Sequence, residues 1–268
     1  MFIDLAKKWY ELRGGCFHID ECWRKYREEL PELFDDYMRF WGAPPSSDAA
    51  IPSRQECMQR VEMVREVYSE VGSGLVRLTE FTGPPPDLVV IVGSAHSNGH
   101  AVRIRESHAA WVDVVSLSTA SQVRVFTTHE LAHAIHYTVN PSLYHSPATF
   151  HMVIRKLWTE GVATYLTMRT LDCTPQEALW ADYLSPEELR RWMVRITHNE
   201  KELWAELNKH TWRTDPEDRL FSVNEHRPLE QWRTGYFCGL RLASRLASEV
   251  GTRSLLDLSV REVEPYLL

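Results

Sequence analysis

Two histidines four positions apart, with a glutamate directly after the first, stand in the segment His129-Glu130-Leu131-Ala132-His133. On an α-helix, residues four apart lie on one face. A helix would therefore direct the imidazoles of His129 and His133 to a common point, where they supply two ligands of a tetrahedral Zn²⁺ site. Glu130 would project to one side, from which its carboxylate can act on water as a general base. The pattern has this chemical meaning only if the segment is helical.

The sequence around the segment favours a helix. Ser118, Thr119 or Ser121 offers a side-chain cap at the start. Asn140-Pro141 ends the helix, because the residue before a proline is pushed out of the α region. We therefore predict that the two histidines and the glutamate lie on a helix.

Residues 87–118, which precede this helix, predict strands. Leu88–Val92 is a β-branched run typical of a buried strand. Asn98-Gly99 is a favoured pair for a two-residue hairpin turn. The residues at 101–105 and 109–117 predict two further strands. We therefore predict a small, largely antiparallel sheet packed on the motif helix.

Apolar residues at helical spacing dominate the rest of the chain. Gly14-Gly15 divides the first helical stretch in two, Gly72 and Gly74 fit the end of the next, and Ser185 is a strong helix start. The predicted helical stretches are 4–41, 55–71, 148–171, 185–209, 229–250 and 253–266, and the predicted loops are 42–54 and 210–228. The predicted fold class is α+β and mostly helical, with N-terminal helices and a helical C-terminal subdomain.

Charge and hydropathy exclude some classes of protein. The formal net charge of −7 argues against a nucleic-acid partner, which would require a basic face. No apolar run approaches the roughly 20 residues of a membrane span. The N-terminal residues lack the apolar region of a signal peptide. We therefore expect no nucleic-acid partner and no membrane partner.

The five cysteines are scattered and odd in number, which fits free thiols in a reducing compartment such as the cytoplasm. Cys16, His18 and Cys22 lie close together in the sequence. Their spacing matches no zinc finger and a fourth ligand is missing, so we do not interpret them as a metal site.

A catalytic zinc site needs a third protein ligand and a position for water. His136 lies two turns from His129 on the same helix, and a straight helix cannot wrap three such residues around one ion. Glu160 is a better candidate, because it lies in an apolar helical stretch where burial of an unpaired carboxylate is costly. Gly161 and Ala163 are small and would let that helix approach the motif helix closely.

The His-Glu-x-x-His helix followed by Trp158-Thr159-Glu160-Gly161-Val162-Ala163 resembles the core of the gluzincin metallopeptidases, in which an Asn-Glu-Gly-x-Ala helix supplies the third zinc ligand. The resemblance covers roughly residues 87–171. It implies that His129, His133 and Glu160 bind Zn²⁺ and that Glu130 is the general base. The two motifs lie further apart than in thermolysin, and no Gly-x-Met-Glu-Asn segment of the aminopeptidase type is present. The chain is more similar to poorly characterised predicted zinc proteases of this clan.

The resemblance also implies features of substrate binding. Gluzincins present an edge strand to an extended peptide, and Trp111–Leu117 is the corresponding segment here, unless it is an interior strand. Gly235-Tyr236 resembles downstream segments of related predicted proteases, which implies that Tyr236 stabilises the oxyanion. His226 is the alternative for this role, and a packing role for Tyr236 also stays open.

Together, the residues and the resemblance predict a zinc metallopeptidase that hydrolyses peptide bonds of a peptide or protein substrate. The expected organisation is an N-terminal helical region at 1–82, a catalytic core at 83–171, and a C-terminal helical subdomain at 172–268 that closes the active-site cleft. Two alternatives remain: an inactive zinc-binding scaffold, and a helical interaction module in which the motif is accidental. The substrate, the choice between endo- and exopeptidase, and the oligomeric state do not follow from the sequence.

Overall fold

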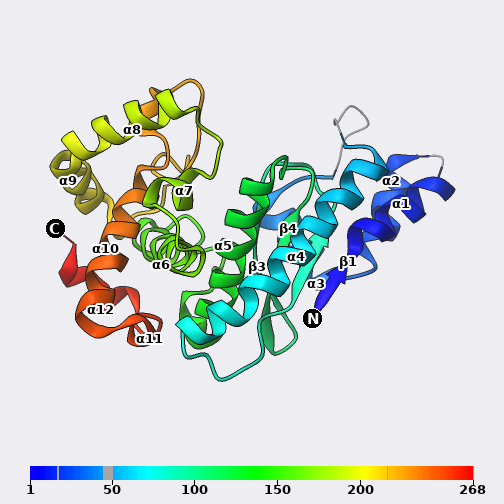
Figure 1. Ribbon diagram of the computed structural model, residues 1–268, viewed down its shortest axis with the longest axis horizontal. Coiled ribbons are helices and arrows are strands. Elements are labelled where there is room, and N and C mark those ends of the chain that lie inside the picture. The colour runs from blue at the N-terminus through cyan, green and yellow to red at the C-terminus, as the bar shows by residue number, and fades with distance from the viewer. Residues whose placement is uncertain (17, 45–50, 216, 268) are drawn as a thin grey trace. The chain divides into compact units, whose positions relative to one another are not determined.

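The structure, a computed structural model, describes residues 1–16, 18–44, 51–215 and 217–267 (Figure 1). Most of these residues are helical, and the sheet in this part of the chain has four strands. The predicted α+β, mostly helical fold class is therefore confirmed. The chain divides into two compact units, Met1–Arg77 with Phe81–Thr138 and Leu78–Glu80 with Val139–Leu268.

The first unit contains the sheet, whose strand order is β1-β2-β4-β3. The strands are β1 (Phe2–Asp4), β2 (Leu88–Ile91), β3 (Gly99–Ile104) and β4 (Ser107–Asp113). β2 pairs in parallel with both β1 and β4, and only β3 and β4 are antiparallel. The sheet is therefore mixed, and the prediction of a largely antiparallel sheet was wrong. The reason is that β3 lies outside β4, so that β4 returns beside β2 in the same direction.

The tight hairpin turn lies at Arg105 and Glu106, and not at Asn98-Gly99 as predicted. Arg105 adopts φ 56°, which is the left-handed region. Gly99 instead begins β3, where a Cβ would lie 2.3 Å from the carbonyl oxygen of Trp111 and 2.8 Å from Cγ of Glu130. The glycine at this position thus serves a close approach between strand and helix, and not a turn.

The position of β4 decides between the edge and interior alternatives for Trp111–Leu117. β4 lies between β2 and β3, so the interior alternative holds, and residues 114–116 follow the strand in a turn. The edge strand on this side is β3, the strand that begins at Gly99.

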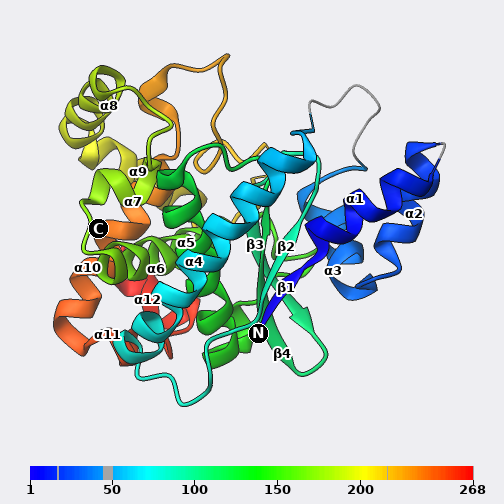
Figure 2. The ribbon, with the colours of Figure 1, turned by 45° about the vertical axis from the view of Figure 1, so that its right-hand side comes forward.

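Helices cover both faces of the sheet in the first unit. Figure 2 shows α4 and α5 to the left of the strands and α1 to α3 to the right. An aromatic cluster forms the core on the side of α1 to α3, with Trp23 in edge contact with Trp9 and Phe34. The helices of the first unit are α1 (Leu5–Gly15), α2 (Ile19–Arg27), α3 (Pro31–Asp36), the π-helix η1 (Tyr37–Trp41), α4 (Arg54–Leu78) and α5 (Ala120–Val139).

Helix α4 is longer than predicted. The sequence suggested an end near Gly72 and Gly74, but the helix continues to Leu78 because Val71 and Leu75 are buried on it. Gly72 is buried against Pro85, where a Cβ would lie 3.2 Å from the proline ring. Of the loop predicted at 42–54, residues 45–50 lie outside the described residues.

Among the described residues of the second unit, the regular elements are helices, and Met152 and Thr214 form an isolated bridge. The helix start predicted at Ser185 is present, and it is a capping box with Glu188. Asn199 divides the stretch predicted as one helix at 185–209 into two. The helices are η2 (Pro141–Leu143), α6 (Val153–Leu171), α7 (Pro175–Trp180), α8 (Pro186–His198), α9 (Glu200–His210), η3 (Leu229–Gln231), α10 (Thr234–Val250), α11 (Thr252–Leu255), α12 (Val260–Val263) and η4 (Glu264–Tyr266).

The two units differ from the three regions predicted at 1–82, 83–171 and 172–268. β1 pairs with β2, which joins the N-terminal helices to the sheet in one unit. α6 packs on α10, because Gly161 and Gly239 allow their backbones to touch. The boundary therefore falls at residue 139, inside the region that the sequence analysis assigned to one catalytic core.

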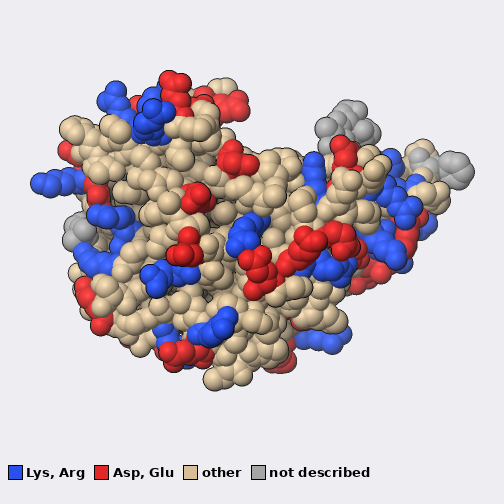
Figure 3. Space-filling view, in the orientation of Figure 1, with Lys and Arg blue, Asp and Glu red and all other residues tan. Residues whose placement is uncertain are grey.

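The distribution of surface charge and the state of the cysteines match what the sequence predicts. Acidic and basic side chains are interspersed on the face shown in Figure 3. All five cysteines are free thiols. In the part of the chain that the structure describes, no helix combines the length and the apolar character needed to cross a membrane.

Candidate functional site

The predicted motif lies on α5, as its chemistry requires. Thr119, one of the three predicted caps, accepts a hydrogen bond from the backbone N–H of Gln122 at 3.1 Å. The helix ends at Val139, before Pro141. Its residues from Gln122 to Tyr137 are almost all buried, which is the behaviour of a helix covered on every side.

His129 and His133 direct their imidazoles to one point, as predicted. Their Nε2 atoms lie 3.1 Å apart, and both side chains are buried. Two nitrogens bound to one tetrahedral zinc ion at the usual bond length lie about 3.3 Å apart. The pair therefore fits a shared Zn²⁺ ion in both donor type and spacing.

Glu130 lies beside this pair and faces β3. It is 5% exposed, and its Cγ fills the space that Gly99 leaves open. Its Oε2 lies 3.7 Å from Nδ1 of His100. A buried carboxylate on the same helix as two metal-type histidines is the arrangement expected of a general base.

His100 is a residue of this site that sequence reasoning missed. It lies on β3, is 4% exposed, and its ring centroid is 4.8 Å from that of His133. No local motif marks it, because its neighbours in sequence form an ordinary strand. It reaches the site only because β3 packs against α5, which is information that a single stretch of sequence does not hold.

Among the described residues, the buried side chains of His100, His133 and Glu160 make up a group that could bind a metal ion. His133 and Glu160 are predicted zinc ligands, and His129 is not a member of this group. The chemistry of the three fits zinc, since imidazole and carboxylate are both zinc ligands.

Glu160 lies in the middle of α6 in the second unit. It is 5% exposed, and its neighbours Thr159 and Gly161 are fully buried or packed against backbone. Its backbone carbonyl accepts a hydrogen bond from the hydroxyl of Thr164 at 2.8 Å. The predicted burial of this carboxylate on a mid-helix stretch is therefore correct.

His136, Tyr236 and His226 occupy different environments. His136 is fully buried on α5, and burial, with a smaller effect of His133, lowers its pKa to about 3. Tyr236 is half-buried near the start of α10, with the guanidinium of Arg233 4.1 Å from its ring centroid. His226 is exposed in the loop before η3. These positions leave the choice between Tyr236 and His226 for the oxyanion role open.

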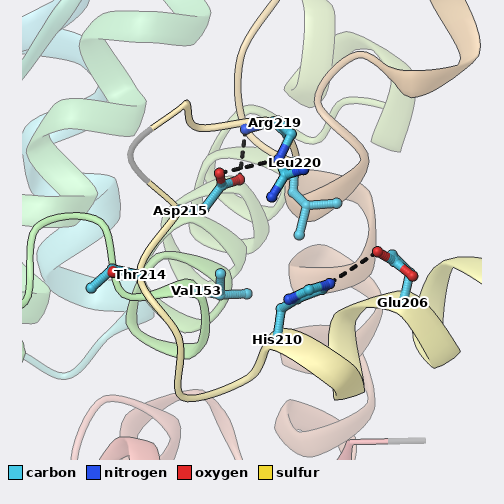
Figure 4. A pocket seen from close by; sticks show the side chains of 7 residues that line it. All are labelled: Val153, Glu206, His210, Thr214, Asp215, Arg219 and Leu220. Carbon is cyan, nitrogen blue, oxygen red and sulfur yellow. Dashed lines mark hydrogen bonds and ion pairs between the residues drawn. The ribbon is translucent and has the colours of Figure 1, made fainter.

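A cavity of about 100 Å³ lies within the second unit (Figure 4). In it, Asp215 accepts hydrogen bonds from the backbone and side chain of Arg219, and His210 contacts Glu206 at 3.0 Å. None of the predicted site residues lines it. Its lining is Val153, Glu206, His210, Thr214, Asp215, Arg219 and Leu220.

Comparison with known proteins finds no family, no curated protein and no solved structure that matches this chain. The resemblance to gluzincins therefore depends on the two short motifs and on the local geometry of the residues in them.

Proposed function

We propose that this chain is a zinc-dependent metallopeptidase of the gluzincin type. The observation that carries the proposal is the 3.1 Å spacing of the His129 and His133 Nε2 atoms beside the buried carboxylate of Glu130. Two converging imidazoles bind the metal, and the adjacent carboxylate accepts and donates a proton as a general base and acid. A purely structural metal site has no use for such a base.

The proposed zinc ligands are His129, His133 and Glu160. Burial supports Glu160, because a carboxylate in an apolar helix is stable only beside a cation or hydrogen-bond donors. Three protein ligands leave one tetrahedral position for water, which is the pattern of catalytic zinc sites.

The residues of the chain have distinct roles in the proposed hydrolysis. When bound, zinc supplies Lewis-acid activation of a water molecule and of the scissile carbonyl. Glu130 takes a proton from the water as its oxygen forms a bond to the carbonyl carbon. Glu130 then passes this proton to the leaving nitrogen, the C–N bond breaks, and a carboxylic acid and an amine are released.

A further donor stabilises the negative oxygen of the tetrahedral intermediate. Tyr236 is our choice for this donor and His226 is the alternative. Replacing Tyr236 with Phe removes only the hydroxyl, so loss of turnover in that variant, with His226→Ala unaffected, assigns the role to Tyr236.

The proposed substrate is a peptide or protein bound in an extended conformation. β3 is one of the two edge strands of the sheet and begins beside Glu130, and backbone pairing to such an edge holds a peptide with little sequence preference. The five free thiols support a reducing compartment such as the cytoplasm as the site of action.

The test is Glu130→Gln, which keeps the shape of the side chain and removes the base. We expect about one zinc ion per chain in both proteins, and at least a hundredfold slower cleavage of quenched fluorescent casein by the variant. Glu187→Gln, an exposed position on α8, is the matched control and should cleave at the wild-type rate. Undiminished cleavage by Glu130→Gln would remove the basis of the proposal.

One observation favours a second function, that of an inactive zinc-binding scaffold. His100 is a further imidazole near His133, and a fourth protein ligand would close the site to water, as in structural zinc sites. In that case the wild-type protein binds zinc and is stabilised by it, but cleaves no peptide.

A further inference from the structure

His100 is placed next to Glu130 by the construction of the first unit. It occupies the second position of β3, opposite Trp111 on β4. The preceding residue, Gly99, lacks the Cβ that would collide with Glu130. The start of β3 therefore leaves space for the Glu130 side chain. Nδ1 of His100 lies 3.7 Å from Oε2 of Glu130.

Two other side chains fix the His100 ring. Its Nε2 lies 3.3 Å from the hydroxyl of Tyr137, which is seven residues after Glu130 on α5 and so shares its face of the helix. The π-helix η1 brings the ring of Trp41 to a centroid distance of 4.0 Å from the imidazole. A π-helical turn is unusual in a short connection and often occurs at a functional site.

These contacts imply where the proton of a neutral His100 lies. If the hydroxyl of Tyr137 donates to Nε2, the proton of the imidazole is on Nδ1. Nδ1 faces the carboxylate of Glu130, which accepts hydrogen bonds and does not donate them when charged. The tautomer and the position of the carboxylate are thus coupled.

Metal binding is the competing role for His100, because it belongs with His133 and Glu160 to the group that could bind an ion. The same ring is already engaged by Tyr137 and faces Glu130.

We propose that His100 is a positioning residue whose Nδ1–H dipole orients the carboxylate of Glu130 across 3.7 Å, a contact longer than a hydrogen bond. Tyr137 sets the tautomer and Trp41 holds the ring. This inference rests on the proposed peptidase function for its consequence in catalysis. Losing His100 leaves the metal ligands in place but lets the Glu130 carboxylate rotate away from the attacking water, so turnover falls and substrate binding does not.

The first test does not depend on turnover. Zinc-loaded protein labelled with ¹⁵N-histidine is compared by NMR with the Glu130→Gln variant, and the His100 signals are assigned from their loss in His100→Asn. We expect a neutral His100 with its proton on Nδ1, and a shift of the Nδ1 signal in Glu130→Gln but not in Glu187→Gln. A proton on Nε2, a metal-bound His100 nitrogen, or an unchanged signal in Glu130→Gln overturns the proposal.

The second test uses quenched fluorescent casein as the substrate. His100→Leu should lower kcat about 10- to 100-fold with KM within about twofold and zinc content unchanged. His100→Asn, whose amide N–H can replace Nδ1–H, should recover most of kcat at the same thermal stability as His100→Leu. An equal loss of kcat in both variants means that His100 contributes packing alone and does not orient Glu130. If the wild type cleaves nothing, the peptidase function fails, and the NMR result alone decides the contact between His100 and Glu130.

Discussion

Gly161 of α6 and Gly239 of α10 approach so closely that a Cβ on Gly161 would lie 2.3 Å from the carbonyl carbon of Gly239. Glycine in a helix interior is otherwise unfavourable by about 1 kcal/mol relative to alanine. The contact therefore outweighs the cost of the glycine, and it fixes the helix that carries Glu160 within the second unit.

Gly161→Ala should lower the free energy of unfolding by about 1–3 kcal/mol, because the added methyl group meets backbone that cannot move aside. Urea unfolding measures the change. Gly14→Ala on α1 is the matched control, since no atom lies within 4 Å of the added Cβ, and it should be neutral or stabilising. Equal effects of the two substitutions would show that the helix contact is looser than described.

Zinc binding should depend on both motif histidines. His129→Ala and His133→Ala should each lose the metal, whereas His198→Ala, an exposed position at the end of α8, should retain it. Chelation of zinc from the wild type should lower its thermal stability, because a ligand that binds only the folded state stabilises it by about 4 kcal/mol at a thousand times its Kd. Elemental analysis and thermal scans make the measurement, and full zinc content in His133→Ala contradicts the ligand assignment.

Gly99→Ala tests the contact between β3 and the general base. The added Cβ would lie 2.8 Å from Cγ of Glu130 and 2.3 Å from the Trp111 carbonyl oxygen. We expect a stability loss of about 1–3 kcal/mol and at least tenfold slower casein cleavage, with zinc still bound, because the strain displaces Glu130 and leaves the two histidines. A variant that cleaves at the wild-type rate would separate Glu130 from the reaction.

Asp113 gives the first unit a pH-dependent stability. It is fully buried at the end of β4 and accepts backbone hydrogen bonds from Gly93, Ala95 and Val115. Burial raises its pKa from 3.8 to about 6, against the lowering effect of these bonds. The folded state therefore holds a proton between these pH values that the unfolded chain has released.

Because the folded pKa is the higher one, this group stabilises most below pH 3.8, and its contribution is lost as the pH rises to about 6. The loss is on the order of 2–3 kcal/mol. Urea unfolding of the wild type and of Asp113→Asn across this range isolates the effect, because the amide loses one backbone bond at every pH but does not titrate. A difference between the two proteins that stays constant from pH 4 to pH 7 would refute the shift.

Local chemistry predicted the elements that have strong local signals. Ser185 with Glu188, Thr119, and Pro141 mark helix ends through interactions within a few residues, and each does so in the structure. The convergence of His129 and His133 follows from helix geometry alone. These features need no knowledge of the rest of the fold.

The sequence-based predictions were wrong where residues distant in sequence determine the local structure. Asn98-Gly99 fits a hairpin turn locally, but the need of Glu130 for space places Gly99 in a strand. Phe2–Asp4 is too short to predict as a strand, and only pairing with β2 makes it one. His100 is in the same class, since its neighbours at the site come from η1 and α5.

The pairing of β1 with β2 also sets the order in which the first unit can form during synthesis. β1 leaves the ribosome before the other elements of this unit, but its partner β2 follows only after α1 to α4, and β4 and α5 come later still. The apolar faces of α1 to α3 therefore stay exposed to solvent until the later elements have been synthesised, because the contacts that bury these faces are distant in sequence. Any chaperone dependence of this protein should concern the interval before α5 has emerged.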